Sequence, residues 1–197
     1  CAGAALNLSV TAAGSGTPTY QWKKNGTAIG GATSATFNIG ATALTDAGSY
    51  TVDVTSGGVC ANTVTSTVAV VTVDSPAAIT VQPTASQTLC QGNSVTLKVT
   101  ATGTGLTYQW KKAGTPIGGA TASTYTIASL TTADAAIYTV DVTSTGVCAN
   151  TITSSNADVL VDTPASITVQ PTASTTLCVG GTLNLTVTAA GSGTPTY

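Results

Sequence analysis

The side chains in this sequence that could form covalent bonds or bind metals are its five cysteines: Cys1, Cys60, Cys90, Cys148 and Cys178. The sequence has no histidine, and no two cysteines are spaced as C-x-x-C. Zinc sites and redox-active dithiols therefore lack their usual ligand sets. We predict structural disulfides, which form in an oxidising compartment.

Proton-transfer chemistry would have to come from seven aspartates and five lysines, because histidine, glutamate and arginine are absent. General acid–base catalysis needs positioned titratable groups. A nucleophilic serine or threonine needs an activating base, and no G-x-S-x-G motif is present. We predict no catalytic residue, no cofactor and no enzymatic activity.

Four of the aspartates occupy recurring positions. Asp46 and Asp134 each precede a tyrosine by four residues, where a carboxylate is expected to cap a turn. Asp74 and Asp162 precede a proline by two residues. Calcium binds six or more oxygens, and each of these positions offers one carboxylate. We therefore predict no metal site.

Two lysine pairs, Lys23 with Lys24 and Lys111 with Lys112, each follow a tryptophan. They are either solvated strand residues or a recurring basic spot that contacts an acidic polysaccharide. Five lysines without arginine, at a net charge of −2, argue against nucleic acid as a partner. No apolar run reaches the ~20 residues of a membrane span.

The sequence repeats itself. YQWKK at residues 20–24 returns at 108–112 and VCANT at 59–63 returns at 147–151, both at a step of 88 residues. Residues 178–197 restate residues 1–20 with four differences. We therefore expect two alternating repeat types and a stretch taken from a longer polymer.

Each repeat contains short segments of alternating apolar and polar residues, separated by Gly, Pro, Asn and Ser. In the second repeat these segments are 95–99, 108–112, 125–127, 134–142 and 157–161. No segment has helical periodicity. This pattern predicts an all-β fold made of antiparallel two-sheet sandwiches.

Several of these residues carry a resemblance to the immunoglobulin sandwich of the I-set type. The motif consists of G-x-S-V-x-L-x-V at 92–99, Trp110, and D-x-x-x-Y-x-V at 134–140, with the fuller DAGSY at 46–50. The pattern YQWKKxGTxIxGAT is similar to tandem immunoglobulin-like modules of secreted and surface proteins of Bacteroidota-type bacteria. The resemblance implies four buried residues that hold the cores together: Trp22, Trp110, Tyr50 and Tyr138.

The sequence departs from antibody domains at the inter-sheet disulfide. The two positions that carry its cysteines correspond to Val99 and Val140 in the second repeat, and to Val10 and Val52 in the first. We therefore expect valine and tryptophan packing to close each core.

Aligning the repeats with the immunoglobulin sandwich in this way predicts the following domains. Residues 1–74 form an immunoglobulin-like sandwich lacking its first strand, residues 75–163 form a complete one, and residues 164–197 form the first strands of a third. The joints around Pro76 and Pro164 are short, and proline restricts their backbone. Semi-rigid head-to-tail stacking is expected.

The same register separates the two cysteines of one domain. Cys90 lies nine residues before Val99 and Cys148 eight residues after Val140, which places them roughly 25 Å apart at opposite ends of the sandwich. A disulfide needs Cα atoms within about 7 Å. We therefore predict an inter-domain bond between Cys1 and Cys148, with Cys60, Cys90 and Cys178 bonded to cysteines outside this sequence. Intradomain pairing and free thiols remain the alternatives.

These features favour a non-catalytic structural role, as a repeat segment of an extracellular filament or adhesin stalk stiffened by inter-domain disulfides. The expected partners are neighbouring copies of the same repeat, joined head to tail or side by side. The expected location is outside the cell or on its surface. The alternative is an immunoglobulin-like binding module that recognises a glycan or a protein through its loops, and a spacer attached to an enzyme is a third reading.

Overall fold

The computed structural model describes residues 1–14, 16–194 and 196, so three residues of the predicted domains, Ser15, Pro195 and Tyr197, lie outside the described part. The regular elements of this part are β-strands and two short 3₁₀ helices, which confirms the all-β prediction. The chain divides into two compact units. The first comprises Cys1–Ala77, Thr102–Leu106 and Ser144–Asn150, and the second comprises Ala78–Ala101, Thr107–Thr143 and Thr151–Tyr197. The boundaries predicted at residues 74 and 163 stay a prediction.

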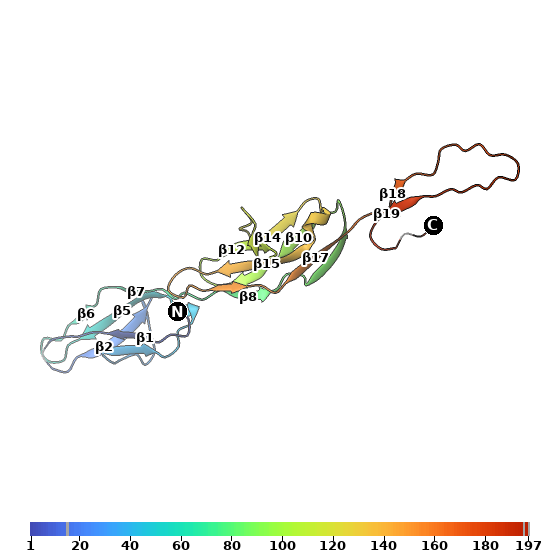
Figure 1. Ribbon diagram of the computed structural model, residues 1–197. Coiled ribbons are helices and arrows are strands. Elements are labelled where there is room, and N and C mark those ends of the chain that lie inside the picture. The colour runs from blue at the N-terminus through green and yellow to red at the C-terminus, as the bar shows by residue number, and fades with distance from the viewer. Residues whose placement is uncertain (15, 195, 197) are drawn as a thin grey trace. The chain divides into compact units, whose positions relative to one another are not determined.

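The first unit contains two antiparallel sheets (blue to cyan in Figure 1). One joins β1 (Leu6–Ser9) to β4 (Thr36–Ile39). In the other, β5 (Gly48–Thr55) is central and pairs with three strands. These are β2 (Thr19–Lys24), β6 (Thr63–Thr65) and β7 (Ala69–Val71), and β3 (Thr27–Ala28) extends the sheet beyond β2.

The two sheets of the first unit pack face to face through aromatic side chains. Phe37 on β4 lies between Trp22 on β2 and Tyr50 on β5, with ring centroids 6.0 and 5.9 Å apart. Trp22, Tyr50 and Val52 are buried. This cluster is the core of the sandwich, because offset aromatic contacts add to the free energy gained by burial.

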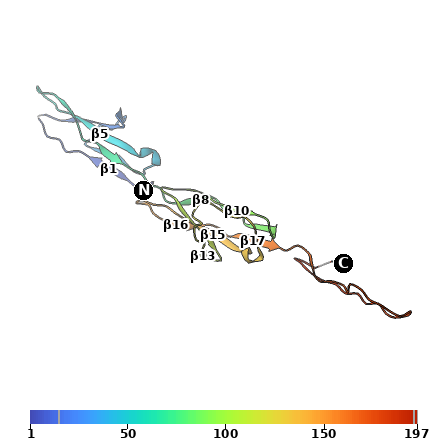
Figure 2. The same cartoon turned by 90° about the horizontal axis from the view of Figure 1, so that it is seen from above.

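The second unit has a larger sheet, and Figures 1 and 2 between them label its strands β12, β13, β15, β16 and β17. β15 (Ala136–Thr143) pairs antiparallel with β12, β16 and β17. A parallel edge strand, β9, completes this sheet beside β17. The bounds are β12 (Thr107–Lys112), β13 (Thr115–Pro116), β16 (Thr151–Thr153), β17 (Ala157–Asp162) and β9 (Ser86–Cys90).

The opposite face of the second sandwich consists of two strand pairs. β10 (Val95–Lys98) pairs with β14 (Thr124–Ile127), and β11 (Thr100–Thr102) pairs with β8 (Ala78–Val81). Tyr125 on β14 lies 6.3 Å from Trp110 and 6.1 Å from Tyr138, which repeats the aromatic cluster of the first unit. Val99 and Val140 are 1% and 0% exposed, so a pair of valines fills the core where antibody domains carry cysteines.

Turns in the two repeats have the same backbone conformation. Asn25 and Gly26 both have positive φ, at 49° and 82°, and so do Ala113 and Gly114, at 46° and 80°. Such pairs form the tight two-residue turns that match the twist of a hairpin. The 3₁₀ helices, Leu44–Asp46 and Thr132–Asp134, come just before β5 and β15.

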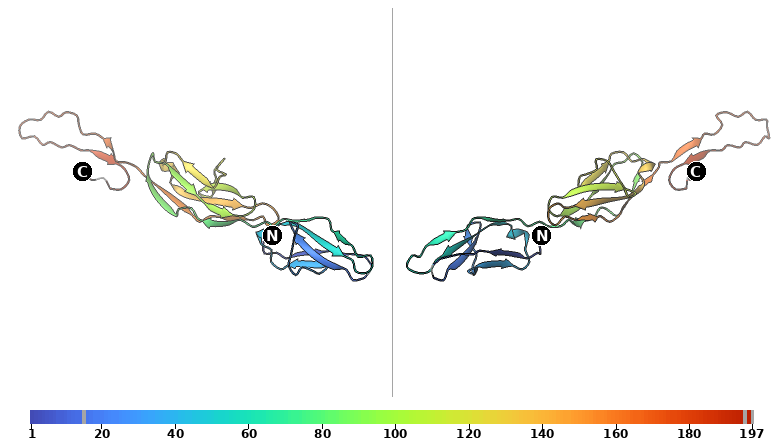
Figure 3. Two further views of the ribbon diagram at one scale, coloured as in Figure 1. Left: turned by 180° about the vertical axis from the view of Figure 1, so that it is seen from behind. Right: turned by 60° about the vertical axis from the view of Figure 1, so that its left-hand side comes forward.

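The C-terminal segment forms one further strand pair, β18 (Ser166–Val169) with β19 (Thr188–Ala190) (orange and red in Figure 3). All four residues of β18 are exposed. This pairing repeats that of β8 with β11, because residues 164–178 closely restate residues 76–90.

Candidate functional site

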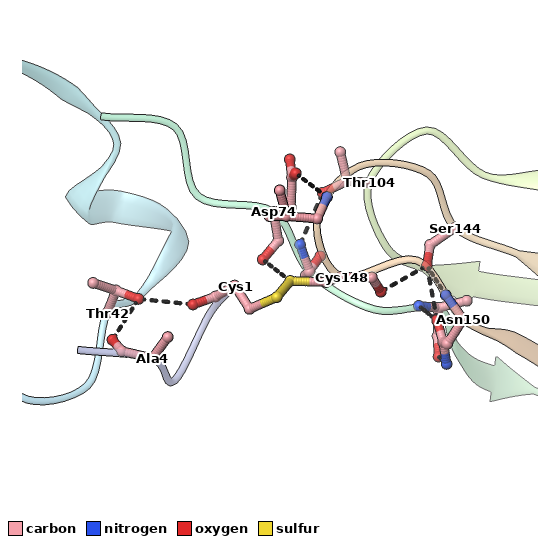
Figure 4. The surroundings of a disulfide bond; sticks show 11 residues. Cys1, Ala4, Thr42, Asp74, Thr104, Ser144, Cys148 and Asn150 are labelled. Carbon is pink, nitrogen blue, oxygen red and sulfur yellow. Dashed lines mark hydrogen bonds between the residues drawn. A yellow bond between two sulfur atoms is a disulfide. The ribbon is translucent and has the colours of Figure 1, made fainter. Parts of the chain in front are cut away.

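Cys1 and Cys148 form a disulfide, with Cα atoms 5.4 Å apart and a sequence separation of 147 (Figure 4). The structure thus brings together the two cysteines that the sequence analysis paired. Both belong to the first compact unit, which includes the hairpin Ser144–Asn150. The prediction of a bond between domains is therefore corrected, because the loop that carries Cys148 is itself part of the unit that contains Cys1.

Asp74 lies next to this disulfide and binds a residue adjacent to each of the two cysteines, Ala2 and Val147. Its carboxylate Oδ2 accepts a hydrogen bond from the N–H of Val147 at 3.0 Å. Its carbonyl accepts one from the N–H of Ala2 at 2.7 Å and lies 3.3 Å from Cys148 Sγ. Gly146 has a φ of +88°, and a Cβ there would collide with the Asp74 carboxylate. Glycine is thus required where the hairpin approaches Asp74.

The Cys1 end is fixed from the other side by Thr42. The Thr42 hydroxyl lies 2.9 Å from the carbonyl of Cys1 and 3.0 Å from that of Ala4. The Thr42 carbonyl accepts from the N–H of Gly3 at 2.6 Å. Thr42 is buried, so these contacts hold the turn at residues 1–4 against the rest of the unit.

The hairpin that carries Cys148 is closed by Ser144 and Asn150. The Ser144 hydroxyl donates to Asn150 Oδ1 at 2.8 Å and accepts from the N–H of Asn150 at 3.1 Å. The Asn150 amide then binds the backbone of Ala77, with Oδ1 accepting from its N–H at 2.6 Å and Nδ2 donating to its carbonyl at 3.2 Å.

Residues 74–77 are bound along most of their length. The N–H of Ser75 donates to Thr104 Oγ1 at 2.9 Å, and the Ser75 carbonyl accepts from the N–H of Thr104 at 3.0 Å. The Thr104 carbonyl in turn accepts from the N–H of Thr145 at 2.9 Å. Together with the bonds of Asp74 and Asn150, these bonds engage backbone groups on both sides of Pro76. We name the set of Cys1, Asp74, Thr104, Ser144, Cys148 and Asn150 the disulfide cluster.

Sequence reasoning missed most of this cluster. It placed Asp74 near Pro76 without a role, and it assigned none to Thr104, Ser144 or Asn150. The usable signal was the exact return of VCANT at residues 59–63 and 147–151, which keeps the cysteine and the asparagine together.

The corresponding hairpin of the first repeat has the same internal bonds. Ser56 Oγ donates to Asn62 Oδ1 at 2.9 Å and accepts from the N–H of Asn62 at 3.1 Å. Cys60 is exposed and has a free thiol, as have Cys90 and Cys178. The hairpin is therefore preformed as it is around Cys148, while its cysteine stays available.

The lysine pairs contact aspartates and backbone carbonyls. Lys23 and Lys111 form ion pairs of 2.5 Å with Asp53 and Asp141. Lys112 Nζ donates to the carbonyl of Ala133 at 2.6 Å. Hydrogen bonds from Lys23 and from Thr65 hold the pKa of Asp53 below its ordinary value.

The four predicted core residues are buried and donate their polar hydrogens. Trp22 and Trp110 Nε1 donate to the carbonyls of Ser34 and Ala122, each at 2.9 Å. Tyr50 and Tyr138 hydroxyls donate to the carbonyls four residues earlier, at 2.8 and 3.0 Å. These bonds offset the cost of removing the Trp N–H and Tyr O–H groups from water.

The aspartates before these tyrosines cap the 3₁₀ helices, as predicted from their spacing. Asp46 and Asp134 Oδ2 accept from the N–H groups of Ala43 and Thr131 at 2.8 and 2.9 Å. Hydrogen bonds from the Thr131 hydroxyl and N–H lower the pKa of Asp134. Burial, reinforced by Asp134, raises the pKa of Tyr138 to about 12.

Within residues 1–14, 16–194 and 196, no group of three or more Cys or Asp side chains is placed to hold a metal ion. In the same residues, no helix has the length and apolar character to cross a membrane.

Comparison with known proteins identifies the architecture. Residues 76–161 match the family described as "Ig-like domain CHU_C associated". A stretch of 54 residues is 54% identical to the decoration protein of Escherichia phage T5, covering 27% of this chain and 33% of that protein. The chain therefore spans about a third of the phage protein.

Solved structures with tandem immunoglobulin domains have the same fold. The N-terminal four domains of Dscam1 isoform 6.9 superpose with a TM-score of 0.62 at 23% identity, covering 81% of this chain and 42% of that one. Titin domains I67–I69 give 0.57 at 17% identity, covering 86% and 64%. The chain thus consists of tandem immunoglobulin-like β-sandwich domains.

Proposed function

We propose that this chain is a structural repeat segment of an extracellular filament or adhesin stalk of a Bacteroidota-type bacterium, stiffened by disulfides. The observation that carries the proposal is the disulfide cluster, in which a covalent bond and a continuous set of hydrogen bonds hold residues 74–77. A flexible connection would leave such backbone groups to water.

The remaining cysteines extend the proposal to other molecules. Cys60, Cys90 and Cys178 are exposed, and we infer that they bond to cysteines of neighbouring copies of the same repeat. Disulfides persist in oxidising surroundings, which supports a location outside the cell or on its surface. A net charge of −2 allows copies to lie side by side with little repulsion.

Electron microscopy of a polypeptide made of several joined copies of residues 1–177 tests this role. We expect straight rods whose persistence length falls when the disulfides are reduced. The Cys1→Ser variant should show the same loss. Flexible particles whose curvature ignores reduction would refute the structural role.

A second candidate is a binding module that attaches to a larger assembly or a glycan. Its support is the identity to a phage decoration protein and the exposed Val59 and Val147 in the two cysteine hairpins. A glycan array, and a pull-down with Val59→Ser as control, would separate this candidate from the first. Specific capture that depends on Val59 would favour it.

A further inference from the structure

The disulfide between Cys1 and Cys148 changes the covalent route along the chain. The two residues have a sequence separation of 147, and one S–S bond bridges it (Figure 4). Tension on a polypeptide is carried by covalent bonds in preference to hydrogen bonds, which are weak by comparison. A pull that reaches Cys1 therefore crosses to Cys148 and leaves the main chain of residues 2–147 without load.

The first sandwich lies wholly inside this covalent loop. Its strands, from β1 to β7, occupy residues 6–71. A load that arrives through residues before Cys1 takes the same route, so the shelter does not depend on what precedes this residue. The core of Trp22, Phe37 and Tyr50 then bears no tension along the chain.

Most of the second sandwich lies inside the loop as well. Its strands from β8 to β15 occupy residues 78–143, and only β16 and β17 of this sandwich follow Cys148. Strand β17 ends at Asp162, where the chain leaves the sandwich. The part of the second sandwich that carries the load is therefore the segment of residues 148–162.

The strands of this segment are already close to fully extended. Both β16 and β17 pair antiparallel with β15, and four residue steps from Thr153 to Ala157 lie beside three steps of β15, which is a bulge of one residue. Ser154 holds the bulge, because its hydroxyl accepts from the N–H of Val140 at 3.0 Å and its N–H donates to the Val140 carbonyl at 2.9 Å. Pulling residues 151–162 straight would thus gain about one residue, or ~3.3 Å.

We propose that the disulfide of Cys1 and Cys148 is a redox-controlled limit on how far the chain can be stretched, with residues 148–162 as the tension-bearing strand. While the bond is intact, both sandwiches stay folded under a load that unfolds them in the reduced protein. Once the bond is reduced, the same load acts on residues 2–147, whose strands separate and lengthen the chain. The inference rests on the proposed function for the source of the load, because a filament or stalk is pulled along its length.

A dithiol reductant switches the chain between these states. Cys148 is half-buried, so the bond is open to a small thiol. A thiolate of the reductant attacks one sulfur, the S–S bond breaks, and a mixed disulfide forms while the other cysteine leaves as a thiolate. The second thiol of the reductant then closes a cyclic disulfide and releases the remaining cysteine. Two electrons and two protons have passed from the reductant to Cys1 and Cys148.

The two states differ by a length that can be measured. The intact bond keeps the two Cα atoms 5.4 Å apart, whatever the load. A fully extended chain spans up to about 3.3–3.6 Å per residue, so a separation of 147 residues adds roughly 500 Å when the bond is open.

Pulling the full 197-residue chain in an optical trap, through peptide tags fused to both ends, tests the proposal. The oxidised protein should show no unfolding step from either sandwich. In dithiothreitol we expect unfolding steps that make the chain roughly 500 Å longer than the oxidised one at the same force. Cys1→Ser should show these steps in both buffers. Cys178→Ser removes a thiol that is free in this structure, so it should match the wild type in both.

Unfolding steps of equal length in oxidised and reduced wild type would overturn the proposal, and so would peptide mapping that finds Cys1 and Cys148 unlinked under oxidising conditions. Equal steps together with joined repeats that form straight rods in the microscope would remove the length limit and leave the proposed function standing. Joined repeats that bend freely, together with an oxidised chain that shows no steps, would remove the filament and leave the length limit.

Discussion

The side-chain amide of Asn150 binds the backbone of Ala77 through both of its polar atoms, at 2.6 and 3.2 Å. The amide thus binds both the N–H and the C=O of one residue, as a neighbouring strand does in a sheet, although Asn150 lies in a loop. It fixes the chain just before β8 and β9, the first two strands of the second sandwich.

Asn150→Ala removes both hydrogen bonds and leaves the Ala77 groups and the Ser144 hydroxyl without this partner. We expect a loss of about 1–3 kcal/mol in the free energy of unfolding, measured by urea titration. Asn62→Ala is the control, because Asn62 makes only the contact to its own hairpin. An equal loss in both variants would contradict this role of Asn150.

Cys1→Ser removes the disulfide from a loop of 147 residues. Because the bond restricts the unfolded chain, we expect a destabilisation of about 2–4 kcal/mol, seen as a lower Tm in calorimetry under oxidising conditions. Under reducing conditions wild type and variant should coincide. Cys178→Ser should match the wild type in both buffers.

Acid should destabilise the protein through aspartates whose pKa is lowered by folding. Asp53, Asp134 and Asp141 are of this kind. Their contribution is present above the unfolded pKa of about 3.9 and is lost as pH falls through the lower folded values. Unfolding free energies from urea titrations should therefore be flat near neutrality and fall below about pH 4. Asp134→Asn should make this fall shallower, and an unchanged acid limb would count against the cap.

Alkali should act through Tyr138, whose pKa is raised to about 12 by burial and by Asp134. A raised pKa stabilises the fold below the unfolded value of about 10, and this stability is lost as pH rises from there through 12. Tyr138→Phe should cost about 1 kcal/mol at neutral pH, because the bond to the Asp134 carbonyl is lost. It should also flatten the alkaline limb. Tyr125→Phe is the control, since Phe37 stands at the equivalent position of the first repeat.

The cores were predictable because their signals are local. Alternating apolar and polar residues around Trp110 predict a strand. The spacing of Asp134 and Tyr138 predicts the capped turn that leads into the next strand. Neither signal depends on the rest of the chain. The buried Val99 and Val140 followed from the same register. These positions depend on period-two patterning, which a sequence displays directly.

Strand β9 could not be predicted in this way. Its sequence, SQTLC, is largely polar, and it is a strand because it pairs in parallel with β17. The place of Cys148 in the first compact unit has a similar origin. Contacts of Asp74, Thr104 and Asn150 decide it, and each of these residues is an ordinary loop residue in sequence.

The sequence did not predict the ion pairs of Lys23 and Lys111. A solvated lysine was one expectation, yet Lys23 and Lys111 each pair with an aspartate on the neighbouring strand. The pairing depends on strand register, which becomes visible only when β2 lies beside β5 and β12 beside β15.

Positions 99 and 140 carry valine where antibody domains carry the two cysteines of the disulfide that joins their sheets. Packing of the core around Val99 and Val140 then involves no covalent bond, while the attachment of the Ser144–Asn150 hairpin to Cys1 does. A reductant would therefore break the link between Cys1 and this hairpin and leave the valine contact of the second sandwich in place.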